Sequence, residues 1–174
     1  WMLNTRSQRE QRAAINAAAA KIIDDPALAE LATQLVSRGP DAPPLFVVTP
    51  SMLLPRHRRA AQWDAAESCL YSDGWDGYPL SLFRMLKHAV DNEARNMAFL
   101  SGDEHLPCYA RIMVTDVVNN RVSVFYSIHT AAAYAPFPFA NGFKAQQLEQ
   151  ETLFFNVGAT SVEYQSDKLA AEPI

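Results

Sequence analysis

The 174-residue sequence is poor in cysteine, glycine and basic residues, and each shortage excludes a class of protein. Two cysteines, Cys69 and Cys108, can form at most one disulfide and match no zinc-binding spacing, so we expect two buried thiols. Six glycines and the lack of a sustained heptad exclude a collagen-like or coiled-coil rod. Fifteen Lys and Arg against 19 Asp and Glu leave a net charge of −4, which excludes charge-driven binding of nucleic acid.

Long apolar runs are lacking as well. Nothing approaches 18 consecutive apolar residues, so we expect no membrane-spanning helix and no membrane partner. No secretory signal is recognisable, and the first residue is Trp1 rather than methionine, so we expect a fragment of a longer protein. The apolar content of 49% still suffices for one core. We therefore interpret residues 1–174 as one partial domain, with an α/β part at 1–106 and a β-rich part at 107–174.

Helical composition dominates two stretches of the α/β part. Residues 5–38 are rich in Ala, Leu, Gln and Arg and predict two helices, separated at Pro26, with Asp25 capping the second. An amphipathic helix is predicted from Pro79 onward, because Leu82, Met85, Leu86 and Ala89 share one face.

Short apolar runs predict the strands. Residues 45–49 are typical of a strand buried on both faces, and residues 96–100 predict a second strand. A long loop at 56–77 and a helix separate them, which favours a parallel pair. Turn residues then predict two hairpins, formed by 109–116 with 121–128 and by 153–157 with 161–165.

The sharpest chemical pattern is the segment Gly102-Asp103-Glu104-His105, which follows the second strand. Ligands of open α/β sheets bind outside such strand ends. Side chains two residues apart in an extended segment point the same way, so Asp103 and His105 can converge on a divalent cation. An Asp in a turn beside a His satisfied within a loop is the alternative interpretation, and the residues alone leave both open.

Other polar candidates are less specific. Trp75-Asp76-Gly77-Tyr78-Pro79 is either part of a site or a turn covered by two aromatic rings. Arg6 and His57 are candidate contacts for a phosphate, although the arginines flanking His57 are more typical of a solvated surface. Arg9 and His129 are further polar residues without an assigned role, and His129 is more typical of the edge of the core.

Taken in order, several of these segments resemble the alkaline phosphatase D (PhoD-like) family of metallophosphatases. The segments that carry the resemblance are Leu3–Arg9, Val48–Met52, Trp75–Pro79 and Phe99–His105, with a further similarity at Tyr134–Asn141. Each motif is short, but their order and spacing together are fairly specific.

The resemblance implies an α/β fold, namely part of a four-layered αββα sandwich with a dinuclear metal centre. It implies hydrolysis of phosphate mono- or diesters by a metal-activated oxygen nucleophile, with Ca, Fe, Mn or Zn as the metal. Asp103 and His105 would be metal ligands. The residues expected to contact or support the substrate are Arg6, His57, Trp75, Asp76 and Tyr78.

The family's upstream ligand segments are not found in this sequence, and Asn4 stands where the family usually has Asp. We therefore expect the C-terminal half of such an enzyme, inactive alone and requiring the missing N-terminal half of the domain. The alternative hypothesis is a non-catalytic binding or structural remnant that completes its sheet with a partner chain or a second copy of itself.

Overall fold

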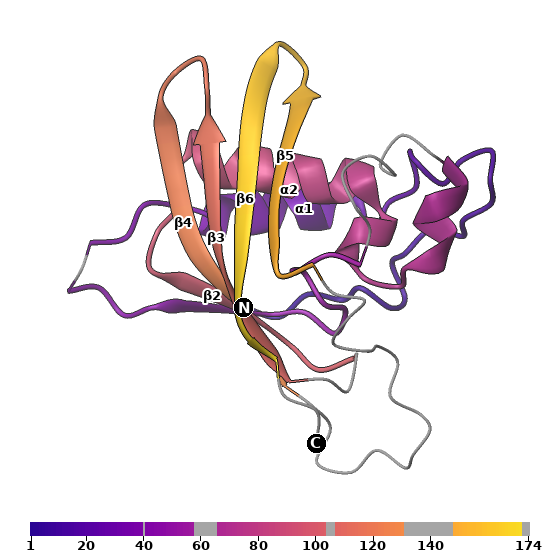
Figure 1. Ribbon diagram of the computed structural model, residues 1–174, viewed down its shortest axis with the longest axis horizontal. Coiled ribbons are helices and arrows are strands. Elements are labelled where there is room, and N and C mark those ends of the chain that lie inside the picture. Colours follow the sequence, from indigo (N-terminus) through magenta and orange to yellow (C-terminus); the bar gives the residue numbers. More distant parts are fainter. Residues whose placement is uncertain (40, 58–65, 104–106, 131–147, 172–174) are drawn as a thin grey trace.

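A six-stranded mixed sheet forms the centre of the protein in a computed structural model (Figure 1). The strand order is β1-β2-β4-β3-β6-β5. The structure describes residues 1–39, 41–57, 66–103, 107–130 and 148–171. The strands are β1 (Leu45–Val48), β2 (Met97–Ser101), β3 (Cys108–Asp116), β4 (Arg121–His129), β5 (Gln150–Val157) and β6 (Thr160–Ala171).

The first half of the sheet is parallel. β1 pairs with β2, and β2 pairs with β4, so the expected parallel pair is confirmed and extended by a third strand. Residues 1–3 lie alongside the carboxyl end of β1, where the Leu3 amide donates to the Val48 carbonyl at 2.8 Å. The carboxyl ends of three parallel strands therefore meet at one edge of the sheet.

The second half of the sheet is antiparallel and consists of the two expected hairpins. β3 pairs with β4 around a turn in which Asn120 has a φ of 52°, a left-handed conformation that Asn tolerates better than most residues. β5 pairs with β6 around Gly158, whose φ is 61°. Because β3 also pairs with β6 and β4 with β2, residues 1–106 and 107–174 contribute strands to the same sheet.

Two α-helices, α1 (Asp25–Gln34) and α2 (Pro79–Asp91), lie against one face of this sheet (Figure 1). Asp24 caps α1, one residue before the expected cap, by accepting a 2.8 Å hydrogen bond from the Ala27 amide. The four expected core residues of α2 are all buried, which confirms its amphipathic pattern. Between helix and sheet lies the core, in which the rings of Phe99 and Phe125 pack 5.5 Å apart.

The described parts of the loop between β1 and α2, residues 49–57 and 66–78, have the irregular form that the sequence predicts. It contains two 3-10 helices, η2 (Ala66–Tyr71) and η3 (Trp75–Gly77). Both cysteines are buried, as expected. Among the described residues, no helix is long and apolar enough to cross a membrane.

Two expectations are wrong. Residues 5–24 form turns and extended chain rather than a helix, because their side chains bond to distant loops instead of supporting a local helical turn. β1 is not buried on both faces, since Val47 is fully buried while Phe46 is 48% exposed. The apolar side chains of β1 therefore alternate between a covered face of the sheet and an open one.

The open face of the sheet continues across several strands. The register places Phe46 beside Ala98 and Ala98 beside Tyr126, so these side chains share the face away from the helices. Tyr126 is 44% exposed and Phe154 is 65% exposed. Val48 and Tyr109 are also exposed on this face. Exposed apolar residues scattered singly are ordinary, whereas these are grouped on one face of the sheet.

Candidate functional site

The carboxyl ends of β1 and β2 border a pocket of about 350 Å³. The parallel sheet places the site there, because side chains and loops that follow neighbouring parallel strands converge at one edge. The pocket is lined by Met2, Leu3, Val48, Thr49, Pro50, Leu100, Ser101, Gly102 and Thr130.

Contacts between β2 and the end of β4 fix the direction in which the chain leaves the sheet. The Ser101 hydroxyl and Nδ1 of His129 lie 2.8 Å apart, and both side chains are buried. The Thr130 amide donates to the Ser101 carbonyl at 2.8 Å. These bonds hold Ser101 in the sheet, so that Gly102 and Asp103 project beyond its edge.

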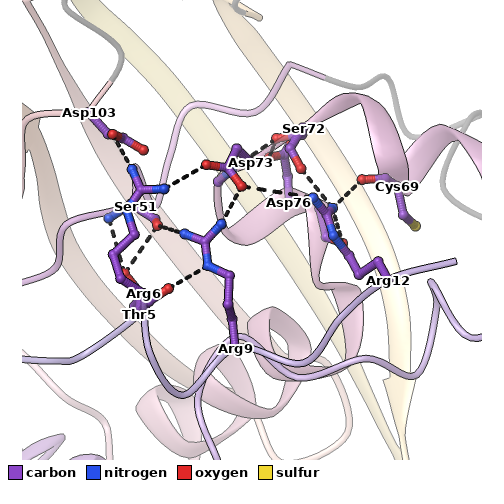
Figure 2. Close-up of polar contacts among 12 residues, drawn as sticks. Thr5, Arg6, Arg9, Arg12, Ser51, Cys69, Ser72, Asp73, Asp76 and Asp103 are labelled. Carbon is purple, nitrogen blue, oxygen red and sulfur yellow. Dashed lines mark hydrogen bonds and ion pairs between the residues drawn. The ribbon is translucent and has the colours of Figure 1, made fainter.

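Asp103 forms an ion pair with Arg6 directly beyond this edge (Figure 2). Its side chain is 26% exposed. The structure therefore brings together one predicted metal ligand and one predicted substrate contact, although they are 97 positions apart in the sequence. His105, the other predicted ligand, lies outside the described residues, as does Tyr134–Asn141.

Three arginines converge on Asp73, in the loop between η2 and η3: Arg6 and Arg9 hydrogen-bond to it, and Nη2 of Arg12 lies 3.9 Å from its Oδ1 atom (Figure 2). Nη1 of Arg6 lies 2.8 Å from Oδ2 of Asp73, and Nη1 of Arg9 contacts the other carboxylate oxygen. Arg9 also donates from Nε to the Thr5 carbonyl at 2.7 Å. The turn of residues 5–9 thus becomes one side of a polar cluster, with the 72–74 loop as the other.

A third arginine, Arg12, holds the 69–77 loop in shape. Its Nη1 atom contacts the carbonyl oxygens of Ser72 and Gly77 at 2.7 and 3.0 Å. Its guanidinium carbon lies 4.3 Å from the centre of the Tyr78 ring, a cation–π distance. A Cβ atom at Gly77 would collide with the Ser72 carbonyl and the Arg12 guanidinium, so the close approach requires glycine.

The segment Trp75–Tyr78 supports this loop from within. Trp75 is fully buried and donates from Nε1 to the Thr49 hydroxyl at 3.1 Å. Asp76 is buried, contacts the Ser72 hydroxyl and accepts a 3.1 Å hydrogen bond from the His57 amide. Trp75, Asp76 and Tyr78 are thus buried, whereas Arg6 is at the surface.

A buried ion pair joins the loop after β1 to the antiparallel half of the sheet. Arg56 and Glu151 form two hydrogen bonds, and their side chains are 0% and 6% exposed. Next to this pair, burial raises the pKa of the Tyr164 hydroxyl far above its ordinary value, so the phenol stays neutral. The pair anchors the backbone from which His57 follows.

The described residues do not by themselves form a metal site. Within them, no group of three or more His, Cys, Asp or Glu side chains is placed to hold a metal ion. A dinuclear centre needs roughly four to six ligands per metal, counting water. Asp103 alone cannot supply them.

The sequence interpretation missed Arg12 and Asp73, and it gave Arg9 only a minor place. Arginine recurs at every third position from Arg6 to Arg12, and this spacing is the signal that could have found the cluster. Its acidic partners lie more than 60 positions away and carry no comparable pattern.

A mixed sheet with helices on one face and a polar cluster at its carboxyl edge defines an α/β protein with a site at the strand ends. The profile of the PhoD-like phosphatases matches residues 1–165, which is most of the chain. The chain therefore belongs to the PhoD-like phosphatase family. Its fold agrees with part of a metallophosphatase fold.

Membership in this family supports a phosphatase-type function and a phosphate ester as substrate. PhoD-like phosphatases are generally metal-dependent. Searches of the curated proteins and of the solved structures gave no match to this chain.

Proposed function

We propose that this chain is part of a metal-dependent phosphoesterase that hydrolyses phosphate mono- or diesters with a dinuclear metal centre. The Arg6–Asp103 ion pair at the carboxyl end of β2 carries this proposal. It sets a carboxylate suited to a metal beside a guanidinium suited to a phosphoryl oxygen, within the part of the chain that the family profile matches.

Asp103 and His105 are the proposed metal ligands. Both follow β2 in the sequence, and their spacing of two is the one that would turn both side chains to one side of an extended chain. Because the described residues offer too few ligands, the proposal requires further ligands from the N-terminal half of the domain. The metal would be Ca, Fe, Mn or Zn.

The residues around this edge would bind and position the substrate. Arg6 would contact the phosphoryl group, because its side chain is 46% exposed and its guanidinium faces the site (Figure 2). His57 would be a second contact, because it directly follows the anchored Arg56. Trp75, Asp76 and Tyr78 would support the loop that carries the arginine contacts.

The test is Asp103→Ala in the longest expressible form of the protein. Bound metal, measured by elemental analysis, should fall, and turnover of p-nitrophenyl phosphate should drop by about 100-fold or more. Residues behind metal ligands already contribute about 10- to 100-fold. Asp41→Ala, an exposed carboxylate outside the site, is the matched control. Unchanged metal content and turnover in Asp103→Ala would refute the assignment.

The open face of the sheet favours a second candidate, a non-catalytic module that associates with another chain. Phe46, Tyr109 and Tyr126 are between 44% and 48% exposed on a face that the described helices do not cover. Such apolar surfaces mark interfaces more often than free surface. A second copy of this chain would bury them and give a homo-oligomer.

Tyr126→Lys separates the two candidates. A charge at this position should dissociate a self-associated module, which sedimentation of the protein at several concentrations measures. For a phosphoesterase whose N-terminal half covers the face, the same substitution should instead lower the stability and turnover of the full-length protein, with its oligomeric state unchanged. Arg111→Glu on the same face is the control, because it exchanges one charge for another without adding one to an apolar position.

A further inference from the structure

The exposed carboxylate of Asp73 occupies a position built for an oxyanion (Figure 2). Arg6 bonds to one of its oxygens and Arg9 to the other. Two guanidinium groups that approach two oxygens of one anion are the arrangement by which proteins bind phosphate. In this structure a side chain of the protein itself stands in that place.

Arg9 is held in this position by contacts that do not involve Asp73. Its Nε atom donates to the Thr5 carbonyl at 2.7 Å, and its Nη2 atom donates to the Ser51 hydroxyl at 3.1 Å. Ser51 is itself buried and bonded to the Thr5 hydroxyl at 3.1 Å. The guanidinium therefore keeps its orientation when Asp73 moves away, and its Nη1 group remains directed at an anion.

Arg6 links the same position to the edge of the sheet. Its Nη1 atom contacts Asp73 and its Nη2 atom contacts Asp103. An anion that replaced the Asp73 carboxylate would therefore bind the same guanidinium group that pairs with Asp103, the proposed metal ligand. Its location agrees with the phosphoryl group of a substrate that also reaches the metal centre.

Asp73 can leave without disturbing the buried part of the loop. Its side chain is 52% exposed, and among the residues that the structure describes its carboxylate contacts only arginine side chains. The neighbouring Ser72 is anchored separately, because its hydroxyl bonds to Asp76. Rotation of the Asp73 side chain into water breaks only ion pairs in which Asp73 is half exposed, and such pairs contribute little to stability.

We propose that Arg6 and Arg9 form a clamp for the phosphoryl oxygens of the substrate, and that Asp73 is an internal competitor that occupies this clamp between turnovers. The proposal rests on the proposed phosphoesterase function for the identity of the anion. Its consequence is that Asp73 weakens the binding of phosphate, because only the fraction of molecules with an open clamp can bind. Weaker binding of phosphate favours release of the product.

The test is a calorimetric titration of the protein with inorganic phosphate. If Asp73 occupies the clamp about nine-tenths of the time, Asp73→Asn should bind phosphate about tenfold more tightly than the wild type. Asp41→Asn removes the same charge from an exposed site elsewhere and should leave the affinity nearly unchanged. Equal affinities of Asp73→Asn and Asp41→Asn would overturn the proposal.

Arg9 gives the second arm of the test. Arg9→Lys keeps the positive charge but loses the contacts to Thr5 and Ser51 that orient the group, so the gain from Asp73→Asn should vanish in the double variant. A retained tenfold gain would show that phosphate binds elsewhere. Circular dichroism shows whether each variant is folded. If Arg9→Lys does not fold, the comparison of Asp73→Asn with Asp41→Asn decides the proposal by itself.

The clamp and the proposed enzymatic function fail in different ways. Phosphate titration needs neither metal nor turnover. Metal-dependent hydrolysis together with unchanged phosphate affinity in Asp73→Asn would overturn the clamp only. A tenfold gain in Asp73→Asn in a protein that binds no metal and hydrolyses no ester would support the clamp as an anion site and remove the phosphoesterase assignment.

Discussion

The two faces of the sheet are built from the same alternation of side chains but have different surroundings. On the face covered by α1 and α2, Val47, Phe99 and Phe125 are fully buried. On the opposite face, Phe46 and Tyr126 are nearly half exposed, although each is adjacent in sequence to one of those buried residues. A period-two pattern therefore shows which residues share a face, but not whether anything covers that face.

The difference also indicates where the free energy of folding of this chain originates. Residues of the covered face contact helix, sheet and loop together, whereas those of the open face contact mainly their neighbours on adjacent strands. Substitutions on the two faces should consequently have unequal effects in the chain by itself. Any element that covered the open face would reduce this inequality.

The largest expected effect is that of Phe99→Ala, on the covered face. Removal of this ring leaves a cavity beside Phe125, and the free energy of unfolding should fall by about 4 kcal/mol. Tyr126→Ala on the open face, one residue from Phe125, is the matched control and should cost less than about 1 kcal/mol. Urea denaturation followed by circular dichroism measures both. Similar losses would mean that the open face is also packed in solution.

A slightly smaller effect is expected at the buried ion pair between Arg56 and Glu151 of β5. Arg56→Met should lower the free energy of unfolding by about 3 kcal/mol, because Glu151 would remain buried without its partner. The double variant Arg56→Met with Glu151→Leu should recover most of this loss, since it buries no charge. A double variant as unstable as the single one would show that other contacts of Arg56 dominate. Arg6→Met, at an exposed pair, should cost less than about 1 kcal/mol.

Sequence reasoning was most successful where the pattern is local. The strands, the two hairpins and the face of α2 follow from alternation, turn residues and 3.6-residue periodicity within about 20 positions. The parallel pairing of β1 and β2 follows from the long connection between them. These features depend on neighbouring residues, which a sequence displays directly.

It failed where distant partners decide the local structure. Residues 5–24 have helical composition, yet Arg9 and Arg12 bond to Ser51, Asp73 and the 69–77 loop, and the backbone follows these bonds instead. Helix propensity amounts to less than about 1 kcal/mol per residue, so several charge-assisted contacts, two of them partly buried, outweigh it. The same partners complete the candidate site, which explains why no sequence pattern indicates Asp73, whereas Asp103 is a candidate because it follows a strand.

The smallest expected effect lies in the helix layer, at His88 of α2, which lines a pocket together with α1 residues such as Leu28. Burial lowers the pKa of His88 below its ordinary value of 6.5, although the charge of Asp91 opposes this shift. A histidine with a lowered pKa resists protonation in the folded state, so stability should fall as the pH drops through 6.5 and level off below the folded pKa. His88→Gln cannot be protonated, and the stability difference between wild type and variant should therefore shift in favour of the variant between pH 7.5 and pH 5. Urea denaturation across this range measures it, with the other histidines common to both proteins. Parallel pH profiles would show that His88 has the same affinity for protons in the folded and the unfolded chain. The helix layer would then leave His88 exposed to water, much as Tyr126 is exposed on the uncovered face of the sheet.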